Sequence, residues 1–510
     1  MTFEVAIIGG GPGGYETAIR LSQFGISVVC IEKERLGGVC LNKGCIPTKA
    51  LVKSADLYQT MKNAEEYGLE NCEFNINYDK ILKRKNDIVD KLVGGIEFLF
   101  NKRQIPLIKK NVTKISRNQT ELERGNFTLY SDPVGTMSSS SAQTEELCTA
   151  NHIIIATGSE PKQLPFLPFD NDKVLSSDQV LNMKTLPKSL TIIGGGVIGC
   201  EFACIFKQLG VEVNIVEYLP ELVATEDEEI SKRLSMSLKK LGIKVYPNTA
   251  VQSAVEVLGC RGVAKNELHL SSSEDNNIEL QLSKGCRSQA PNTPTNGKTI
   301  TSEKVLVSVG RNPVFDIETV GFELEKNNSF IEINDLCQTS ADNIFAIGDV
   351  TGKLMLAHTA SKQGLLVADY LNHKLNNKDM VLNPIDYTNI TACIFTSPEV
   401  ASCGLTEKQA KEQYENIKIG KFPYSANGKA LASGSITGFV KTIINADTDE
   451  IIGMHIMGYI ATELIAQASI LIKTKAKVND VANIVFAHPT ISECIMESIE
   501  DTHKSAIHLV

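Results

Sequence analysis

The sequence lacks several features that would place it in whole classes of protein. No run of apolar residues approaches the roughly 18 that a membrane-spanning helix needs, so we predict no membrane span. It contains no long basic stretch, and its formal net charge is -9, which argues against a dedicated nucleic-acid surface. What remains is the composition of an ordinary globular enzyme, with 42% hydrophobic and 22% charged residues.

The sequence also shows no targeting segment and no disulfide framework. Phe3 to Ile8 already reads as a buried strand and a glycine turn follows at once, which leaves no room for a signal or transit peptide. The 13 cysteines are scattered without the regular spacing of a disulfide-rich secreted domain. We therefore expect a cytoplasmic protein, or one of an organelle matrix if a leader has been removed.

The length of 510 residues predicts about three or four domains. A strand–turn–helix–strand pattern occurs twice, which indicates either two bound nucleotides or a duplicated fold with one idle copy. Each copy has an apolar strand, a glycine turn, a helix and a second strand that ends on an acidic residue. The expected elements are strands 4–8 and 27–32 around helix 13–24, and strands 190–193 and 212–217 around helix 197–209.

Other segments are typical of strands or of surface loops. Short apolar runs at 152–156, 304–309 and 343–347 predict further strands. Residues 131–146 and 271–298 are rich in Ser, Asn, Pro or Gly, so we expect two mobile insertions that bury little surface. From about residue 383 the pattern becomes α+β, with strands expected at 391–396, 439–444 and 451–457 and an apolar helix at 461–474.

The two glycine turns have the spacing of dinucleotide-binding fingerprints. Their glycines permit a tight turn, and the pyrophosphate can approach backbone amides where the helix dipole favours negative charge. An acidic residue at the end of the second strand can accept hydrogen bonds from ribose hydroxyls. In the second copy this residue would repel the 2′-phosphate of NADP, so NAD fits better. The predicted residues are Gly9, Gly11, Gly14 and Glu32 in the first copy, and Gly194, Gly196, Gly199 and Glu217 in the second.

Cys40 and Cys45 are the most specific signal in the chain. Five residues apart in an ideal helix, they would lie about 8 to 9 Å apart, which exceeds the roughly 7 Å limit for a disulfide. A redox-active pair therefore requires a distorted helix start, which Pro47 and three glycines (Gly37, Gly38 and Gly44) can provide. The alternatives are two buried free thiols or half of a metal site. No Cys/His pair nearby completes a zinc set, so we predict no metal.

A third candidate lies near the C-terminus. His488 and Glu493 flank a proline turn, with the carboxylate five residues after the imidazole. Histidine suits proton exchange with a thiol at neutral pH, and a carboxylate on its far nitrogen would fix the tautomer. A His-Pro turn on its own is more often structural, so this interpretation needs support from elsewhere in the chain.

Motifs spread over nearly the whole chain resemble those of the pyridine nucleotide–disulfide oxidoreductase family. Leu41-Asn42 and Ile46-Pro47 favour the branch that acts on lipoamide over the glutathione-type branch. The resemblance implies an α/β fold with two Rossmann-like domains, for FAD and NAD, and a C-terminal α+β dimerisation domain. The motifs are the cysteine segment, both glycine fingerprints, Ala156-Thr157-Gly158, Gly310-Arg311-Asn312-Pro313, Gly348-Asp349 and the turn from His488 to Glu493.

The resemblance also implies domain boundaries. We expect an FAD domain at 1–162, an NAD domain at 163–310 carrying the insertion 271–298, a central domain at 311–384 that completes the FAD site, and a dimerisation domain at 385–510. It further implies a homodimer. The expected partners are lipoyl domains of 2-oxo-acid dehydrogenase complexes or the H protein of the glycine cleavage system.

Roles of individual residues follow from the resemblance. Cys45 would face the flavin and Cys40 would exchange with the dithiol substrate, while His488, oriented by Glu493, would act as base from the other subunit. Lys49 would lie by the flavin and pair with Glu201. The remaining cofactor contacts carried over are Thr157, Gly158, Ser159, Gly310, Gly348, Asp349, Met355, Leu356, Ala357 and His358.

The sequence departs from the family pattern at several places. Phe486 stands where the family often has a histidine, and Lys43 replaces a usual valine between the cysteines. Residues 111–113 lack the glycines often found near the flavin adenine, so that contact stays unassigned. The expected reaction is oxidation of protein-bound dihydrolipoamide by NAD⁺. The alternatives are a reductase for another disulfide, which would prefer NADPH, and a non-catalytic FAD-binding protein, which would not need Cys40, Cys45 and His488 together.

Overall fold

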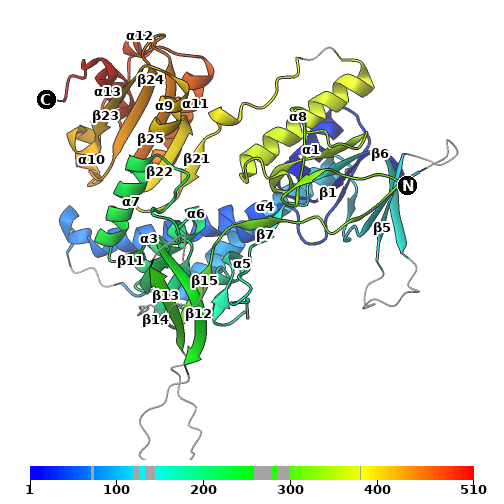
Figure 1. The fold of residues 1–510 in the computed structure, drawn as a ribbon, viewed down its shortest axis with the longest axis horizontal. Coiled ribbons are helices and arrows are strands. Elements are labelled where there is room, and N and C mark those ends of the chain that lie inside the picture. The colour runs from blue at the N-terminus through cyan, green and yellow to red at the C-terminus, as the bar shows by residue number, and fades with distance from the viewer. Residues whose placement is uncertain are drawn as a thin grey trace, which may run out of the picture. The chain divides into compact units, whose positions relative to one another are not determined.

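The fold is taken from a computed structural model that describes residues 1–70, 74–118, 126–132, 144–257, 277–284, 299–378 and 381–509 (Figure 1). Two compact units make up the chain. The first comprises Met1–Ala50, Leu82–Pro161 and Arg311–Ile385, and the second comprises Leu51–Ile81, Lys162–Gly310 and Asp386–Val510. None of the helices in the described part of the chain combines the length and apolarity that a bilayer span needs. The four predicted domain ranges stay predictions.

The first unit is built on a sheet whose core is parallel. Both glycine-turn strands of the first copy lie in it as predicted, although their bounds shift by one or two residues. The side chains of its central strands are buried on both faces, as strands covered on two sides require. The parallel strands, in spatial order, are β3 (Leu107–Ile108), β2 (Val28–Ile31), β1 (Thr2–Ile8), β6 (Glu145–Ile155) and β20 (Ile344–Ala346). The sheet continues beyond β6 with β5 (Phe127–Ser131), which is antiparallel to β6, then β4 (Lys114–Arg117), which is antiparallel to β5, and ends with β17 (Glu318–Val320), which is parallel to β4.

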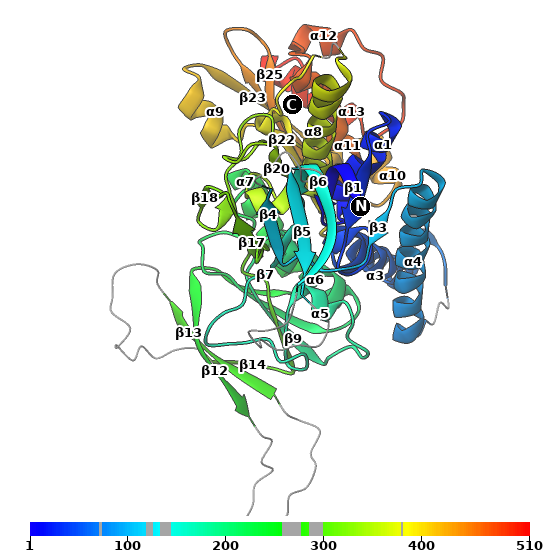
Figure 2. The ribbon, with the colours of Figure 1, turned by 90° about the vertical axis from the view of Figure 1, so that its right-hand side faces the viewer.

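Three helices cover one face of this sheet. They are α1 (Pro12–Gln23), α4 (Tyr78–Lys102) and α8 (Ala357–Asn376), and their buried side chains form one core with those of β1 and β2. The view in Figure 2 displays the full length of α4. The core side of α4 follows helical spacing, with Val89, Val93, Ile96 and Phe100 buried. This helix was not predicted from the sequence.

The second unit repeats the order of the first four parallel strands, and its fifth strand comes from the segment before the glycine turn. Its parallel sheet runs β11 (Lys244–Tyr246), β10 (Glu212–Val216), β9 (Ser189–Ile193), β15 (Lys304–Val307) and β8 (Val174–Leu175). Helix α6 (Val197–Gln208) follows β9, as α1 follows β1, and α7 (Glu228–Lys240) precedes β11. The prediction of two Rossmann-like units on one chain is therefore confirmed, because each has its glycine turn between the central strand and a helix.

The prediction for the second insertion is partly wrong. Residues within 271–298 form strand β13 (Asn277–Lys284), which pairs with β12 (Thr249–Val257) and β14 (Thr299–Ser302) in an antiparallel sheet. Ile278, Leu280 and Leu282 are buried against the parallel sheet. The polar composition of the whole window hid a period-two alternation of apolar residues. Residues 258–276 and 285–298 lie outside the described residues.

The first insertion is also partly structured at its ends. Strand β5 extends to Ser131 and β6 begins at Glu145, and these residues pair with each other. The expectation of a loop over all of 131–146 is therefore wrong at both ends. Residues 133–143, which include the four-serine run, lie outside the described residues.

The C-terminal part of the second unit is the predicted α+β structure. An antiparallel sheet runs β21 (Ala392–Ile394), β22 (Glu399–Gly404), β25 (Ile451–Gly458), β24 (Phe439–Asn445) and β23 (Ile417–Pro423). On one face α11 (Ala461–Lys473) packs on β22 and β25, and α13 (Glu493–Glu500) packs on β23 and β24. The short helices are α9 (Glu407–Gln413), α10 (Gly428–Ala432) and α12 (Val478–Ala482).

Helices α1 and α8 approach closely through glycine. A Cβ atom added at Gly364 of α8 would lie 2.0 Å from Oγ1 of Thr17 and 2.8 Å from the carbonyl oxygen of Gly13, both in α1. A side chain there would force the helices apart. The crossing matters for the site because α8 begins at Ala357, within the segment Met355–His358 that was predicted to contact the flavin.

We predict that Gly364→Ala destabilises the first unit by roughly 1 to 3 kcal/mol, the usual cost of overpacking a tight core. The matched control is Gly94→Ala on the exposed side of α4, where an added Cβ meets nothing within 4 Å. That substitution should be neutral or stabilising by up to about 1 kcal/mol, because alanine favours helix over glycine. Urea unfolding followed by circular dichroism compares the midpoints; equal midpoints for both variants would contradict the packing argument.

Candidate active site

The first glycine turn leaves no room for larger residues. Gly9 has a φ of +109°, and a Cβ atom there would lie 2.2 Å from the carbonyl oxygen of Ala156. A Cβ atom at Gly14 would lie 1.9 Å from the carbonyl oxygen of Gly9. Gly11 is the N-cap of α1 and has no side chain to cap the helix, so the first amides of α1 receive no side-chain acceptor. Such a helix start binds phosphate groups.

Glu32 closes this turn from the end of β2. Its Oε2 atom accepts a hydrogen bond from the Gly10 amide at 2.6 Å, and Oε1 accepts one from the Glu34 amide at 2.7 Å. The side chain is buried, so the carboxylate depends on these two amides for its solvation. The carboxylate that was predicted to contact ribose therefore also fixes the turn.

The second turn reproduces this geometry. Glu217 Oε2 accepts from the Gly195 amide at 2.5 Å, and Oε1 accepts from the Leu219 amide at 2.6 Å. A Cβ atom at Gly199 would lie 2.0 Å from the carbonyl oxygen of Gly194. Gly196 is the N-cap of α6, again with no capping side chain, and an added Cβ would meet nothing within 4 Å. The second copy is thus as well formed as the first.

After the acidic residue of each copy, the backbone comes back to the glycine turn of the same copy and hydrogen-bonds to it. The Gly37 amide donates to the carbonyl oxygen of Gly10 at 2.7 Å, and the Val223 amide donates to that of Gly195 at 2.8 Å. Beyond these hydrogen bonds, the two copies continue into different elements. The first continues into the segment with Cys40, and the second continues into α7.

The cysteine pair lies at a break between two helices. Helix α2 (Gly38–Lys43) ends at Gly44, which has φ -143° and ψ -109°, and α3 (Cys45–Lys62) begins with the second cysteine. The predicted distortion is confirmed, because one continuous helix does not carry both cysteines. Gly38, with φ +54°, lies against the first turn, where an added Cβ would be 2.7 Å from Cα of Gly11.

Both cysteines are half-buried. The hydrogen bond to the Cys45 side chain, together with burial and the charge of Cys45, raises the pKa of Cys40, while Lys49 acts in the opposite direction. Their side chains are thus within hydrogen-bonding distance, and this arrangement is suited to disulfide formation. Lys43, the unusual residue between them, forms an ion pair with Glu34 at 2.5 Å on the surface.

A polar chain surrounds Asp349. The Ser159 hydroxyl donates to Asp349 Oδ2 at 2.5 Å, and Arg311 donates to the Ser159 hydroxyl at 2.7 Å and to its carbonyl oxygen at 2.6 Å. The Gly348 amide donates to Oε1 of Gln363, a buried residue of α8, at 2.6 Å. The structure therefore brings Ser159, Gly348 and Asp349 together as predicted. Gln363 was missed, since one polar residue on a helix gives no signal of its own.

Two buried hydroxyls in this region have no hydrogen-bond partner among the described residues. They are Oγ1 of Thr157, directly after strand β6, and Oγ1 of Thr359, in the first turn of α8. Gly158 has a φ of +74° with open space around its Cα. Of the predicted segment Met355–His358, Met355 and His358 are exposed, and Leu356 and Ala357 are half-buried. Unpartnered buried hydroxyls beside the first glycine turn fit a polar ligand such as a dinucleotide.

The predicted proton-transfer pair is present in the second unit. Nδ1 of His488 lies 2.9 Å from Oε1 of Glu493, and the Thr490 amide donates to Oε2 at 2.8 Å. Burial alone would raise the pKa of Glu493, but the hydrogen bonds from Thr490 and His488 outweigh it and lower the pKa. Glu493 therefore stays ionised and holds the imidazole by Nδ1, which leaves Nε2 outside this hydrogen bond. The His488 side chain is 79% exposed.

Two further residues support this turn. Asn427, the N-cap of α10, donates its side-chain amide to the carbonyl oxygen of Thr490 at 3.0 Å. Gln467 of α11 donates to the hydroxyl of Ser492 at 3.0 Å. Neither was predicted, because the sequence separations of 63 and 25 residues carry no local pattern.

The remaining predicted residues are placed as follows. Lys49 lies one helical turn after Cys45 in α3. Glu201 is buried in α6 and accepts a hydrogen bond from the Phe395 amide at 2.9 Å. Gly310 has a φ of +114°, and its carbonyl oxygen accepts from the Lys162 amide at 3.0 Å. Lys49 belongs to the first unit and Glu201 to the second, so their pairing stays a prediction, as do the roles of all the predicted site residues.

Two models of one protein family match most of the chain. The model of the family described as pyridine nucleotide-disulphide oxidoreductase matches residues 3–364. The model of the dimerisation domain of the same family matches residues 390–499. Together these ranges include both glycine turns, the cysteine segment and the turn from His488 to Glu493.

Named relatives are similar over their full length. The chain is 38% identical to a dihydrolipoyl dehydrogenase of Bacillus subtilis, covering 99% of both chains. It is 36% identical to that of Thermus scotoductus, covering 100% of this chain and 99% of the relative. Among solved structures, LpdA of Mycobacterium tuberculosis superposes with a TM-score of 0.80 at 23% identity, over 98% and 99% of the two chains. The flavoprotein disulfide reductase RclA of Escherichia coli gives 0.77 at 22% identity, with the same coverage.

We predict that Gly38→Ala disrupts the cysteine segment. The new Cβ would press on the Gly11 backbone, which cannot yield, in a conformation that alanine already disfavours. The control is Gly68→Ala, which has a similar φ of +73° but nothing within 4 Å, and should cost only about 1 kcal/mol of strain. Non-reducing peptide mapping after air oxidation measures the fraction with Cys40 joined to Cys45. This fraction should fall in the first variant alone; an equal fall in both would show that backbone strain, and not the contact with Gly11, is responsible.

Proposed function

Because the chain belongs to the pyridine nucleotide-disulphide oxidoreductase family, we propose that it is a dihydrolipoyl dehydrogenase. It would oxidise protein-bound dihydrolipoamide with NAD⁺ through a disulfide between Cys40 and Cys45. The observation that carries this proposal is the attachment of the cysteine segment to a dinucleotide turn, by the hydrogen bond from Gly37 to Gly10 and the contact of Gly38 with Gly11. Full-length identity to enzymes of that name supports it.

Family membership implies FAD and a pyridine nucleotide, and the two turns are the candidates to hold them. Gly9, Gly11, Gly14 and Glu32 would hold FAD, with Thr157 and Asp349 as further polar contacts. Gly194, Gly196, Gly199 and Glu217 would hold the nicotinamide nucleotide. When bound, FAD would supply the electron transfer between the cysteine pair and the nicotinamide. The carboxylate of Glu217 would favour NAD over NADP by repelling a 2′-phosphate.

The chain's own residues would perform the thiol chemistry. His488 would take the proton of one substrate thiol through Nε2, while Glu493 stabilises the imidazolium that forms. The substrate thiolate would attack Cys40, forming a mixed disulfide and releasing Cys45 as a thiolate. The second substrate thiol would then displace Cys40. The products are oxidised lipoamide and a reduced pair at positions 40 and 45, so two electrons and two protons have moved to the protein.

We further propose a homodimer in which the base of one subunit serves the cysteines of the other. The match of residues 390–499 to a dimerisation domain supports a dimer. The cysteine pair and His488 belong to different units of the chain, and His488 is highly exposed, as a residue that completes a neighbour's site would be. Lipoyl domains of 2-oxo-acid dehydrogenase complexes, or the H protein of glycine cleavage, would present the substrate.

A second candidate is a flavoprotein reductase acting on another disulfide. The likeness of the fold to that of RclA is the observation that supports this second candidate. The cysteine pair and His488 would suit a reductase of another disulfide equally well. Glu217, placed in the second turn by two backbone amides, argues against the use of NADPH that a glutathione-type reductase would show.

We predict that the purified protein is flavin-bound and reduces lipoamide with NADH. Cys40→Ser and Cys45→Ser should each abolish this activity, by a factor of about a thousand or more, because each removes one sulfur of the disulfide. Both variants should still bind flavin, since neither side chain forms the glycine turn. Stopped assays of NADH oxidation with and without lipoamide provide the measurement.

Two comparisons make this test specific. NADPH should be used much more slowly than NADH, with the preference lost in Glu217→Gln, so equal kcat/KM values for both nucleotides in the wild type would remove the NAD assignment. Glutathione disulfide in place of lipoamide should give little turnover. Normal lipoamide reduction by either cysteine variant would contradict the redox-pair assignment itself.

Mixing two inactive variants tests the shared site. Cys40→Ser subunits and His488→Gln subunits should regain activity when dissociated and reassociated together, because a mixed dimer restores one intact site of its two. Native mass spectrometry would verify that mixed dimers have formed. If they form and activity stays absent, the base acts within its own subunit or not at all.

A further inference from the structure

A row of polar residues crosses the middle of the C-terminal sheet. Strand register places Ser402 opposite His455, His455 opposite Lys441, and Lys441 opposite Lys421. Directly opposed residues in antiparallel strands point to the same face. We call these four residues of β22, β25, β24 and β23 the polar row. Their sequence neighbours point to the other face, which packs on α11 and α13.

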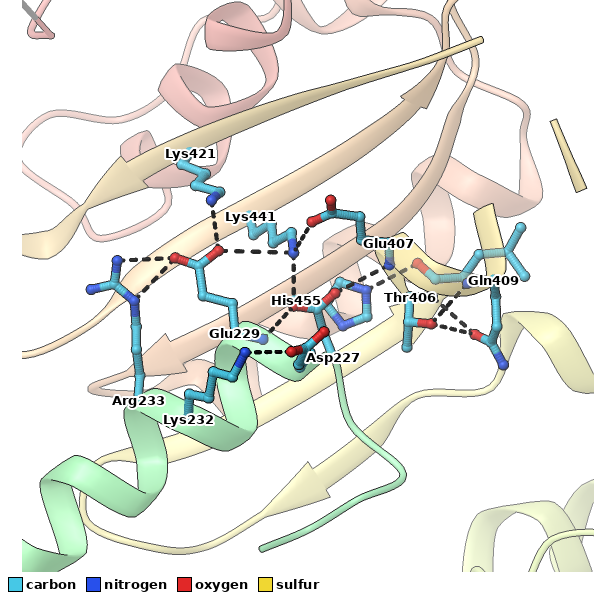
Figure 3. A network of polar contacts seen from close by, with 12 residues as sticks. Asp227, Glu229, Lys232, Arg233, Thr406, Glu407, Gln409, Lys421, Lys441 and His455 are labelled. Atoms are coloured by element: carbon cyan, nitrogen blue, oxygen red, sulfur yellow. Dashed lines mark hydrogen bonds and ion pairs between the residues drawn. The ribbon is translucent and has the colours of Figure 1, made fainter. Parts of the chain in front are cut away.

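The polar row is matched by acidic residues that precede and begin α7 (Figure 3). Lys421 pairs with Glu229 at 2.6 Å, and Lys441 pairs with Asp227 at 2.7 Å and with Glu229 at 3.8 Å. Ser402 hydrogen-bonds to Glu226. The order of the acids along the chain, 226, 227 and 229, thus follows the order of the row across the sheet. These contacts connect the residues that precede and begin α7 to three of the four strands, β22, β24 and β23, and so fix the position of α7 on the sheet.

Lys441 and Asp227 form the centre of this contact. The Lys441 side chain is 1% exposed and that of Asp227 is 2% exposed. Glu407 of α9 is a second partner of Lys441, at 2.8 Å. Burial alone would lower the pKa of Lys441, but the hydrogen bonds to Asp227 and Glu407 raise it, so the lysine stays charged. Removing one member of a buried ion pair costs far more than losing a surface pair.

Asp227 joins three elements at once. Its Oδ1 atom accepts from the Glu229 amide at 3.1 Å, which caps α7, and from Lys441 of β24. Its Oδ2 atom accepts from the Glu407 amide at the start of α9, at 3.1 Å. A further contact lies beside it, where the Arg233 guanidinium stacks over the ring of Phe439, 4.5 Å from its centroid.

Val223, which contacts the second glycine turn, lies only four residues before Asp227. Val223, which is buried and has a φ of +43°, donates its amide to the carbonyl oxygen of Gly195. The carbonyl oxygen of Val223 accepts from the Glu226 amide at 2.8 Å and from the Ser231 hydroxyl at 3.3 Å. The turn is therefore connected to the polar row by an unbroken series of hydrogen bonds, with a strained residue between them.

We propose that the polar row and its acidic partners fix the second glycine turn, and that Asp227 is thereby a positioning residue for the nicotinamide nucleotide. The inference rests on the proposed role of that turn. In the first copy, the segment after the acidic residue leads to the cysteines. In the second copy, the segment after the acidic residue leads to the acidic partners of the polar row, which connect the turn to the C-terminal sheet.

The test is the dissociation constant of NAD⁺ for the flavin-loaded protein, by calorimetry, in wild type and Asp227→Asn. Asparagine keeps the cap of α7 but removes the charge that pairs with Lys441. The dissociation constant should rise roughly three- to tenfold, as expected when a residue acts through a packed segment. The flavin content should stay at the wild-type value, because the first glycine turn is not part of this series of hydrogen bonds.

The matched control is Lys232→Met on the exposed side of α7. Among the residues that the structure describes, Lys232 pairs only with Glu228 on the same helix, in an ion pair between side chains that are 59% and 69% exposed. The substitution Lys232→Met should leave the dissociation constant of NAD⁺ unchanged. Glu407→Gln, which keeps Asp227 in place, should give a rise of about twofold, and it serves as the test if Asp227→Asn does not accumulate as soluble protein.

The outcomes separate this inference from the proposed function. A wild-type protein that binds flavin but no NAD⁺ would overturn the role of the second turn and this inference with it. A wild type that binds NAD⁺, with the same dissociation constant in Asp227→Asn, or in Glu407→Gln where that variant is the test, would overturn the positioning role alone. A lower melting temperature without a change in nucleotide affinity counts as the same contradiction, since it shows a purely structural contact.

Discussion

The backbone amides of Gly10 and Gly195 each donate to a carboxylate 22 residues further along the chain. These two hydrogen bonds fix the shape of both glycine turns, because each joins the turn after a central strand to the end of the neighbouring strand. A hydrogen bond to a buried charge contributes about 1.5 to 3 kcal/mol, and its loss would leave the carboxylate without solvation. The glycines follow from the same constraint, since a Cβ at Gly9 or Gly194 would lie within 2.4 Å of a backbone oxygen.

The two copies share this closed turn and differ in what they connect to it. In the first, the chain passes Gly37 and reaches Cys40 and Cys45 at a helix break, so the two cysteines are fixed to a turn that would hold FAD. In the second, the chain passes Val223 and reaches Asp227, whose buried partner Lys441 lies in the C-terminal sheet. The same closed glycine turn would thus position the cysteines in the first copy and the nicotinamide nucleotide in the second.

Local patterns in the sequence predicted the parts that depend on local geometry. Both glycine turns, the helix break between Cys40 and Cys45, and the contact of His488 with Glu493 follow from spacing over a few residues. Long-range partners could not be predicted in this way: Gln363 accepts from an amide 15 residues away, and Lys441 pairs with an acid 214 residues away. The charge of Lys441 within an apolar strand was a signal that a partner must exist, but it did not identify one. Strand β13 was missed because its alternation is short and lies in a polar window.

In the proposed function, electrons from a nicotinamide reach Cys40 and Cys45. This transfer can be measured by counting free thiols at each cysteine, by mass spectrometry after rapid alkylation, before and after one equivalent of NADH is added anaerobically to the oxidised, flavin-loaded protein. We expect two new thiols, located at Cys40 and Cys45, and none when Cys45 is replaced by serine. Consumption of NADH with no new thiol at either position would contradict the transfer.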